Sequence, residues 1–305
     1  MSDPRLPRAA SPAPSASTGP STRTQGDAQA STPEAAAGAG RGGSAAPIVQ
    51  YAALSDIGSE RPHNEDRWQV APDSGLLVVA DGMGGYRAGE VAAELAVQTV
   101  CQLVQDLLAL GMEPGEALAR AIAAANDEIR DFAMANPECL GMGTTVICAI
   151  VAERRVHLAH VGDSRAYLLR DARLSRLTRD HSIGQQIVDA GRLSEHEVRE
   201  FAARGILTRA LGVEDAVQAD AQTLDWREGD TLLLCSDGLT DPVDDTAIEA
   251  LLLAQADAGP GAQARALIGG ALQAGGADNI TAVVARAGLP ARMPGTGGAS
   301  GKRAH

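Results

Sequence analysis

The chain has 305 residues and a formal net charge of −13, with 45% hydrophobic and only 2% aromatic residues. A strongly negative protein disfavours a nucleic-acid or anionic-membrane surface as its partner, because like charges repel. We find no apolar run of the roughly 18 residues that a membrane helix needs and no signal-peptide core, so a cytoplasmic protein without a membrane span is expected.

The two ends of the chain differ in composition from its middle. Residues 1–46 consist mainly of Ala, Ser, Thr, Pro and Gly, and residues 288–305 are similar. Such segments cannot bury enough apolar surface to offset the entropy of ordering them, so we expect two disordered tails. The sequence between them, residues 47–287, is predicted to form one domain without internal repeats.

The predicted domain begins with short strands and continues with long helices. Apolar runs predict strands at 51–57, 67–71 and 76–80. Ala- and Leu-rich sequence then predicts helices near 88–110 and 114–134. Each of these helices is long enough to cover a sheet on one face.

The second half of the domain mixes both element types. The stretch 143–178 alternates and turns like a meander of strands, and polar, helix-prone sequence occupies 182–203. Further strands are predicted at 219–226, 231–235 and 280–286, and further helices near 244–253 and 261–274. Runs of strands separated from runs of helices favour an α+β fold, with sheets in the middle and helices outside.

Four of the apolar strands carry a carboxylate at one end. Asp81 and Asp237 follow the strands of "LVVAD" and "TLLLCSD", whereas Asp278 and the pair Glu65 and Asp66 precede strands. A single Asp-Gly after a strand is ordinarily just a turn. If all these ends meet at one edge, however, the unpaired carboxylates would repel each other and raise each other's pKa. Bound cations would remove the repulsion, so the set predicts a metal site.

The kind of ligand atom indicates which metal would bind. The donors are oxygens, and the four cysteines contain no CxxC pair, which indicates reduced thiols rather than a zinc site or a disulfide framework. Mg²⁺ or Mn²⁺ is therefore favoured over Zn²⁺. Glycines after Asp81 allow a sharp turn that aims a carbonyl, such as that of Gly82, at an ion. Two such ions about 3.5–4 Å apart can activate a shared water, which is hydrolase chemistry.

These residues belong to a longer series of motifs that runs in order through residues 47–287. The stretches are "RPHNED" (61–66), "ADGMGGYRAGEVA" (80–92), "GMGTT" (141–145), "HVGDSRAYLLRD" (160–171), "LTRDHS" (177–182), "VDAGRLS" (188–194), "LTRALG" (207–212), "CSDGLTDPV" (235–243) and "ADNIT" (277–281). The series resembles the metal-dependent protein serine/threonine phosphatases of the PP2C type (PPM), specifically their bacterial branch.

The resemblance implies both a fold and an activity. The fold would be a four-layer α-β-β-α sandwich of two antiparallel sheets, with a flap at about 179–212 beside a two-metal centre. The activity would be hydrolysis of phosphoserine and phosphothreonine by a metal-bridged hydroxide, without a covalent phosphoenzyme. Phosphorylated proteins, including serine/threonine kinases and their substrates, would be the partners of a monomeric enzyme in bacterial signalling, with no nucleic acid and no membrane involved.

The resemblance also assigns metal ligands by position. They would be Asp81, which bridges two ions, Asp237, Asp278 and, through its carbonyl, Gly82. Glu65 and Asp66 would hold ligands or metal-bound waters. Asp163 of "GDSR" matches a ligand of a third, looser ion that Asp237 would share. The alternative for Asp163 is a strand-turn residue that bonds backbone amides, so the choice between two and three Mg²⁺ or Mn²⁺ ions stays open.

Arg61 fits the family's phosphate-binding arginine, because a guanidinium can grip two phosphate oxygens and is always charged. Its alternative is an ordinary surface arginine. The proton donor to the leaving group is less defined, because Met83 stands where many eukaryotic relatives have a histidine. His63, on the same face of an extended segment as Arg61, could donate the proton, or a metal-bound water could.

Three other functions would each explain part of the same pattern. A regulatory module with the same fold but without catalysis would be expected to lack ligand aspartates, and here all are present. A metal hydrolase acting on small phosphoesters stays open. A nucleic-acid phosphodiesterase is disfavoured, because an acidic domain would repel the phosphates of a nucleic acid.

Overall fold

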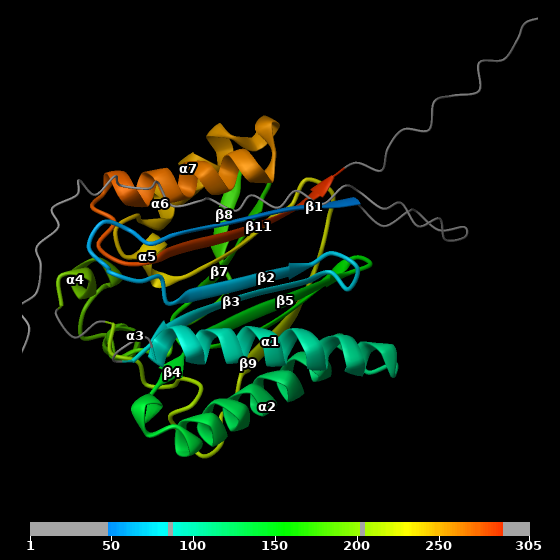
Figure 1. Ribbon diagram of the computed structural model, residues 1–305. Helices are drawn as coiled ribbons and strands as arrows, with labels where there is room; N and C mark the ends of the chain where they lie inside the picture. The colour runs from blue at the N-terminus through cyan, green and yellow to red at the C-terminus, as the bar shows by residue number, and fades with distance from the viewer. Residues whose placement is uncertain (1–47, 85–87, 202–204, 289–305) are drawn as a thin grey trace, which may run out of the picture.

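The structure is a computed structural model that describes residues 48–84, 88–201 and 205–288. These residues form four layers, in which two antiparallel sheets stack face to face and helices cover both outer faces (Figure 1). The predicted α+β sandwich of two antiparallel sheets is confirmed. The predicted tails 1–46 and 288–305 lie outside the described residues, except that Gly288 ends the last strand.

The first sheet has five strands in the order β1-β11-β10-β7-β8. Their bounds are β1 (Ile48–Asp56), β11 (Ile280–Gly288), β10 (Thr231–Cys235), β7 (Arg165–Arg170) and β8 (Arg173–Arg176). Every residue of the central β10, "TLLLC", is buried. A strand that is covered on both faces has a continuous apolar sequence rather than an alternating one. This apolar run predicted β10 with the bounds that the structure shows.

The second sheet has the order β2-β3-β5-β6-β9, with β4 paired to the end of β3. Its strands are β2 (Asp66–Ala71), β3 (Leu76–Met83), β4 (Gly143–Thr144), β5 (Val146–Ala152), β6 (Arg155–Val161) and β9 (Asp220–Asp225). Successive side chains of β3 face opposite layers. Leu77 and Val79 pack in the core between the sheets, whereas Leu76 and Val78 pack under the helices. Asp81 follows Val79 by two residues, so the alternation points its side chain toward the other sheet.

The helices divide between the two faces. The pair α1 (Ala88–Ala109) and α2 (Pro114–Ala135) covers the second sheet, and α6 (Asp245–Ala254) with α7 (Pro260–Gln273) covers the first (Figure 1). The shorter helices are α3 (Ile183–Asp189), α4 (Glu195–Arg199), α5 (Asp237–Thr240), η1 (Pro137–Cys139) and η2 (Ala256–Ala258).

Helix α1 differs from the expectation that the chain has no segment apolar and long enough to span a membrane. Among the described residues it is long and apolar enough to cross a membrane by length and composition alone, although no such segment was expected. In the structure α1 packs against β3 and α2, with Ala92, Ala96 and Val100 fully buried. Small side chains let the helix approach the sheet closely, so its apolar character is that of a core helix.

Candidate active site

The carboxylates predicted from the strand ends converge at one end of the interface between the sheets. Asp66 is the first residue of β2 and lies opposite Asp81 of β3 in the register of the two paired strands. Asp237 follows β10 of the opposite sheet and lies close enough to Asp81 for its charge to raise the pKa of that carboxyl. The structure thus brings these three residues, which come from both sheets, together at this end.

Two details of Asp81 and Gly82 differ from the prediction. Asp81 lies inside β3 rather than after it, because Gly82 and Met83 continue the strand by pairing with β4. Gly82 does not make a sharp turn. A Cβ there would lie 2.0 Å from the carbonyl oxygen of Gly89, so glycine is required for the close approach of α1 to β3.

Burial and like charges raise the pKa of the acids. Burial, followed by the charges of Asp66 and Asp237, raises the pKa of Asp81 well above its ordinary value. Burial and then the charge of Asp241 raise the pKa of Asp237 to about 7. Burial raises the pKa of Asp66 to about 6, although hydrogen bonds from Thr281 and Ser236 lower it. The repulsion inferred from the sequence is present in the fold.

Only one of the two carboxylate oxygens of Asp66 has hydrogen-bond partners. The hydroxyls of Ser236 and Thr281 each donate to its Oδ2 at 2.7 Å. Its Oδ1 is buried and has no hydrogen-bond partner. A buried carboxylate oxygen without a partner costs free energy unless a donor or cation reaches it. Ser236 and Thr281 were not singled out in the sequence, because hydroxyl residues beside a strand are common and only their burial shows the role.

Asp163 joins the same group. It lies in the turn between β6 and β7 and is buried. Burial, followed by the charge of Asp237, raises the pKa of Asp163 well above its ordinary value. The structure thus brings Asp163 near Asp237, as the prediction of a shared site requires.

Asp278 lies at the rim, paired with Arg61. An Nη2 of Arg61 donates to Asp278 Oδ2 at 2.6 Å, and both side chains are more than a third exposed. The buried Asn279 fixes this region, because its Oδ1 accepts the Glu65 N–H at 2.8 Å. Its amide nitrogen donates to the carbonyl oxygens of Ile57 and His63. Asn279 was missed as a site residue, although the "ADN" motif contains it.

Glu65 and His63 take positions beside this rim. The Glu65 carboxylate lies against Gly89 in the first turn of α1, where a Cβ would approach it to 2.6 Å. Burial raises the pKa of Glu65, while Arg61 lowers it. The His63 side chain is exposed. Both residues therefore lie close to Arg61 in the chain but outside the group formed by Asp66, Asp81, Asp163 and Asp237.

The acids fit divalent cations by donor type and charge. Within the described ranges, no three His, Cys, Asp or Glu side chains already form a ready ligand set. Instead Asp278 pairs with Arg61, and the charge of Asp237 raises the pKa of Asp81. Raised pKa values and the unpartnered Oδ1 of Asp66 are the features that hard cations would relieve.

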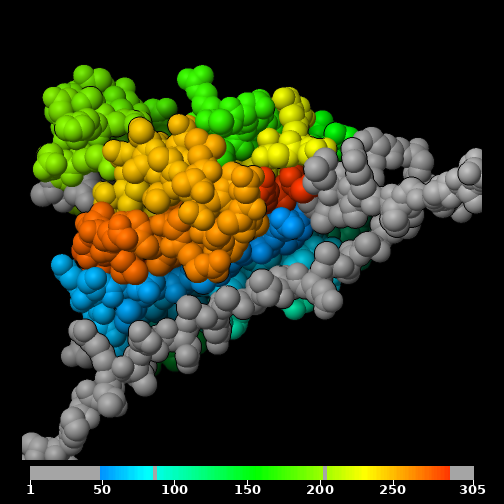
Figure 2. All heavy atoms as spheres, turned by 90° about the horizontal axis from the view of Figure 1, so that it is seen from above, coloured from blue at the N-terminus to red at the C-terminus, as the bar shows by residue number. Residues whose placement is uncertain are grey.

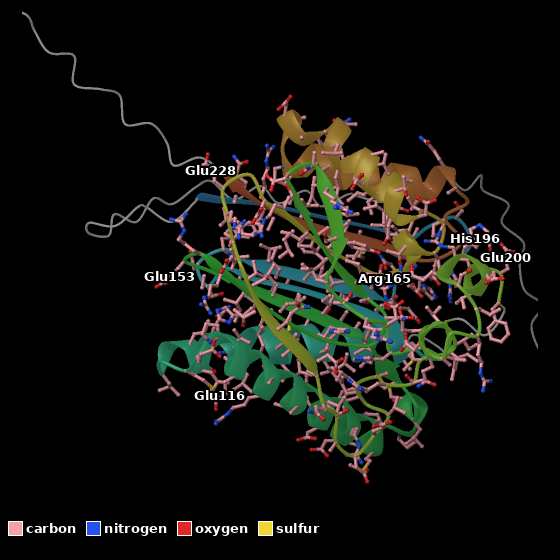
Figure 3. All side chains as sticks on the ribbon, turned by 180° about the vertical axis from the view of Figure 1, so that it is seen from behind. Glu116, Glu153, Arg165, His196, Glu200 and Glu228 are labelled. Atoms are coloured by element: carbon pink, nitrogen blue, oxygen red, sulfur yellow. The ribbon has the colours of Figure 1, made fainter. Side chains whose placement is uncertain are left out.

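A cavity of about 470 Å³ opens beside these acids. It runs from Asp163 and Asp237 to α3, α4 and the start of α6. The flap, defined as residues 179–212, forms one wall and contains α3 and α4. It projects beside the helix layer of α6 and α7 at one end of the molecule (Figure 2). Figure 3 shows His196 and Glu200 on this projecting segment, with Arg165 inward of them.

The comparisons with known proteins agree with the geometry. A family model described as protein phosphatase 2C matches residues 59–258. The chain belongs to this family. It is 41% identical over 243 residues to the serine/threonine protein phosphatase PstP of Mycobacterium tuberculosis, which covers 78% of this chain and 45% of that protein. It is 39% identical to the serine/threonine phosphatase stp of Listeria monocytogenes, over 75% of this chain and 92% of that one.

Solved structures show the same fold. The serine/threonine phosphatase PstP/Ppp of M. tuberculosis gives a TM-score of 0.73 at 40% identity, covering 79% of this chain and 99% of that chain. The catalytic domain of PstP in complex with two manganese ions gives 0.70 at 39%, with the same coverage. The chain spans less than half of the full mycobacterial relative, so the likeness concerns this domain. The family predicted from the motifs is confirmed.

Proposed function

We propose that this domain is a protein serine/threonine phosphatase that hydrolyses phosphoserine and phosphothreonine in proteins. One observation carries the proposal: the buried Asp66 and Asp163 and the half-buried Asp81 and Asp237 gather from both sheets in one group whose pKa values are raised. Perturbed carboxylates in a cleft are candidates for catalysis rather than structure. The manganese-bound PstP domain supports Mn²⁺ or Mg²⁺ as the cofactor.

Under this proposal, some residues of the site would bind the metal ions and others would orient water or bind the phosphate. Asp81, Asp237, Asp278 and the Gly82 carbonyl would hold two ions, and Asp163 with Asp237 a third. Asp66 and Glu65 would orient waters. When bound, the ions supply a nucleophile from water and neutralise charge on the phosphate. The alternative for Asp163, a turn residue, remains compatible with its place between β6 and β7.

Arg61 would bind the phosphate group. Its side chain is 53% exposed at the rim and already holds a carboxylate oxygen of Asp278 at 2.6 Å. A guanidinium that pairs with a carboxylate can grip phosphate oxygens with the same geometry. For the leaving group, the exposed His63 or a water would supply the proton.

Arg61→Ala is expected to raise KM for phosphopeptides roughly 10- to 100-fold, because a hydrogen bond to a charged group contributes about 1.5–3 kcal/mol. Arg61→Lys should recover only part of the loss, since lysine keeps the charge but not the two-point geometry. Steady-state kinetics on all three proteins give the measurement. An unchanged KM in Arg61→Ala would show that Arg61 is an ordinary surface arginine that does not bind the phosphate.

The proposed function is tested by phosphate release with and without Mn²⁺. We expect metal-dependent turnover of phosphoserine and phosphothreonine peptides, with a higher kcat/KM than for p-nitrophenyl phosphate. Faster turnover of the small ester than of every phosphopeptide would favour a small-phosphoester hydrolase. No turnover of either, with Mn²⁺ bound, would favour a regulatory module without catalysis.

The substrates and the compartment follow from the same proposal. We infer that serine/threonine kinases and their targets are the phosphoproteins, and that the enzyme acts as a monomer in the cytoplasm. All four cysteines are buried and unpaired, as in a reducing compartment. The flap wall of the cavity would contact the polypeptide around the phosphorylated residue.

A further inference from the structure

His181 holds both backbone groups of Gly162. The Gly162 N–H donates to His181 Nδ1 at 3.0 Å, and the His181 N–H donates to the Gly162 carbonyl oxygen at 3.0 Å. His181 is buried. Gly162 has a φ of +105°, and a Cβ there would lie 2.6 Å from the Cβ of Thr145. The turn therefore needs glycine, and the two hydrogen bonds between Gly162 and His181 fix its orientation.

This turn leads directly to the acids. Asp163 follows Gly162, and the next residue, Ser164, shares a 2.7 Å hydrogen bond with the Thr145 hydroxyl. The same hydroxyl accepts the Asp81 N–H at 3.0 Å. A displacement of Gly162 would thus act on Asp163 through the chain and on Asp81 through Thr145.

The hydrogen bonds define which nitrogen of His181 carries the proton. Because Nδ1 accepts from Gly162, the neutral ring carries its hydrogen on Nε2. Nε2 lies 3.3 Å from Asp220 Oδ2, which can accept it. Arg209 Nη1 also lies 3.1 Å from Nε2, but its two hydrogens are used by Gln218 O and Asp220 Oδ1. Asp220 therefore fixes the tautomer that lets His181 accept from Gly162.

His181 also lies where the two ends of the flap meet. Its carbonyl oxygen accepts the Thr208 N–H at 2.8 Å, and the next residue, Ser182, forms a β-bridge with Leu207. Its ring stacks on that of His160 in β6, with centroids 4.7 Å apart. His160 Nε2 in turn donates to the Arg179 carbonyl oxygen at 3.0 Å. The ring is thus held between the sheet and the flap.

We propose that His181 is a positioning residue that holds the Gly162–Asp163–Ser164 turn, and through it Asp163 and Asp81, in register with the root of the flap. The proposal rests on the proposed phosphatase function for its kinetic consequence. Its structural part, protection of the Gly162 amide by the imidazole, does not depend on that function.

Three substitutions separate positioning from mere packing. Asn places its amide oxygen near the position of Nδ1 and can still accept from Gly162, whereas Gln reaches the position of Nε2 and leaves Gly162 unbonded. His181→Ala removes both. We expect kcat to fall roughly 10- to 100-fold in His181→Ala and His181→Gln, with KM for p-nitrophenyl phosphate little changed, and to be largely restored in His181→Asn.

Hydrogen exchange of the Gly162 amide in the metal-free protein is the second measurement. We expect faster exchange in His181→Ala and His181→Gln than in wild type and His181→Asn. The matched control is His157→Ala, which removes a buried histidine of β6 paired with Glu113 and Thr223, away from the turn. His157→Ala should leave kcat and Gly162 exchange unchanged, even if it lowers the melting temperature.

The outcomes are distinguishable from those of the proposed function. Wild-type exchange of Gly162 in His181→Ala would overturn the positioning role, as would equal losses of kcat in the Asn, Gln and Ala variants. A wild-type protein without Mn²⁺-dependent turnover would remove the proposed function, while a selective change in Gly162 exchange would still support the geometric role of His181.

Discussion

Asp237→Asn or Asp81→Asn is expected to abolish phosphate release while the domain stays folded. Asparagine keeps the shape of aspartate but loses the charge that a divalent ion needs. Because bound ions contribute several kcal/mol of transition-state stabilisation, kcat should fall at least about a thousandfold. Both acids have raised pKa values in a group of like charges. Neutral amides should therefore leave the metal-free protein at least as stable as wild type.

The measurements are kcat in Mn²⁺ and the melting temperature in a chelator at pH 8. Glu228→Gln makes the same charge change at an exposed position that precedes β10, whereas Asp237 follows that strand at its other end, and it should alter neither quantity (Figure 3 labels Glu228). Full activity in either aspartate variant would refute the site. A marked loss of melting temperature in both would instead show that the carboxylates stabilise the fold.

The sequence predicted the layers and most elements because their signals are local. Strand β10 is a continuous apolar run between polar residues, and its observed bounds equal the predicted ones. Strand β3 was predicted to end at Ala80, but β4 pairs with Gly82 and Met83. That pairing joins residues some sixty positions apart in the chain, and a pattern confined to one segment carries no signal of it.

The candidate site residues differ in how visible they are in the sequence, because the acids stand out and their neutral partners do not. Asp66, Asp81 and Asp237 stand out because charges at the ends of apolar strands are costly without a function. Asn279 and Thr281 do not stand out, since amides and hydroxyls near strand ends are ordinary. The pairing of Arg61 with Asp278 spans 217 positions and emerges only when β11 and the segment before β2 are brought together.

Without divalent ions, the domain is expected to become more stable as the pH falls from 8 to 6. Asp237, with a pKa of about 7, takes up a proton in this range in the folded state. The same carboxyl in the unfolded chain, with a pKa near 3.9, stays ionised. Since the folded state then binds more protons, the free energy of unfolding rises as the pH falls. For a pKa of about 7 the rise between pH 8 and pH 6 is about 1.4 kcal/mol.

Asp81 and Asp163 act in the same direction, because their pKa values are also raised. The buried His160 and His181 act in the opposite direction, since burial lowers their pKa, and this limits the comparison to pH 6 and above. A gain of about 1.4 kcal/mol from Asp237 alone corresponds to a rise in melting temperature of roughly 3 to 6 °C for a domain of this size.

Melting curves in a chelator and in excess Mn²⁺, each at pH 6, 7 and 8, make the test. Bound cations should neutralise the acids, so Mn²⁺ should stabilise the domain most at pH 8 and remove most of the pH dependence. The histidines contribute equally to both series, so the difference between them isolates the carboxylates. Asp237→Asn should flatten the chelator series, since it removes one titrating group. Parallel pH profiles with and without Mn²⁺ would mean that these aspartates neither titrate in the folded domain nor bind the metal.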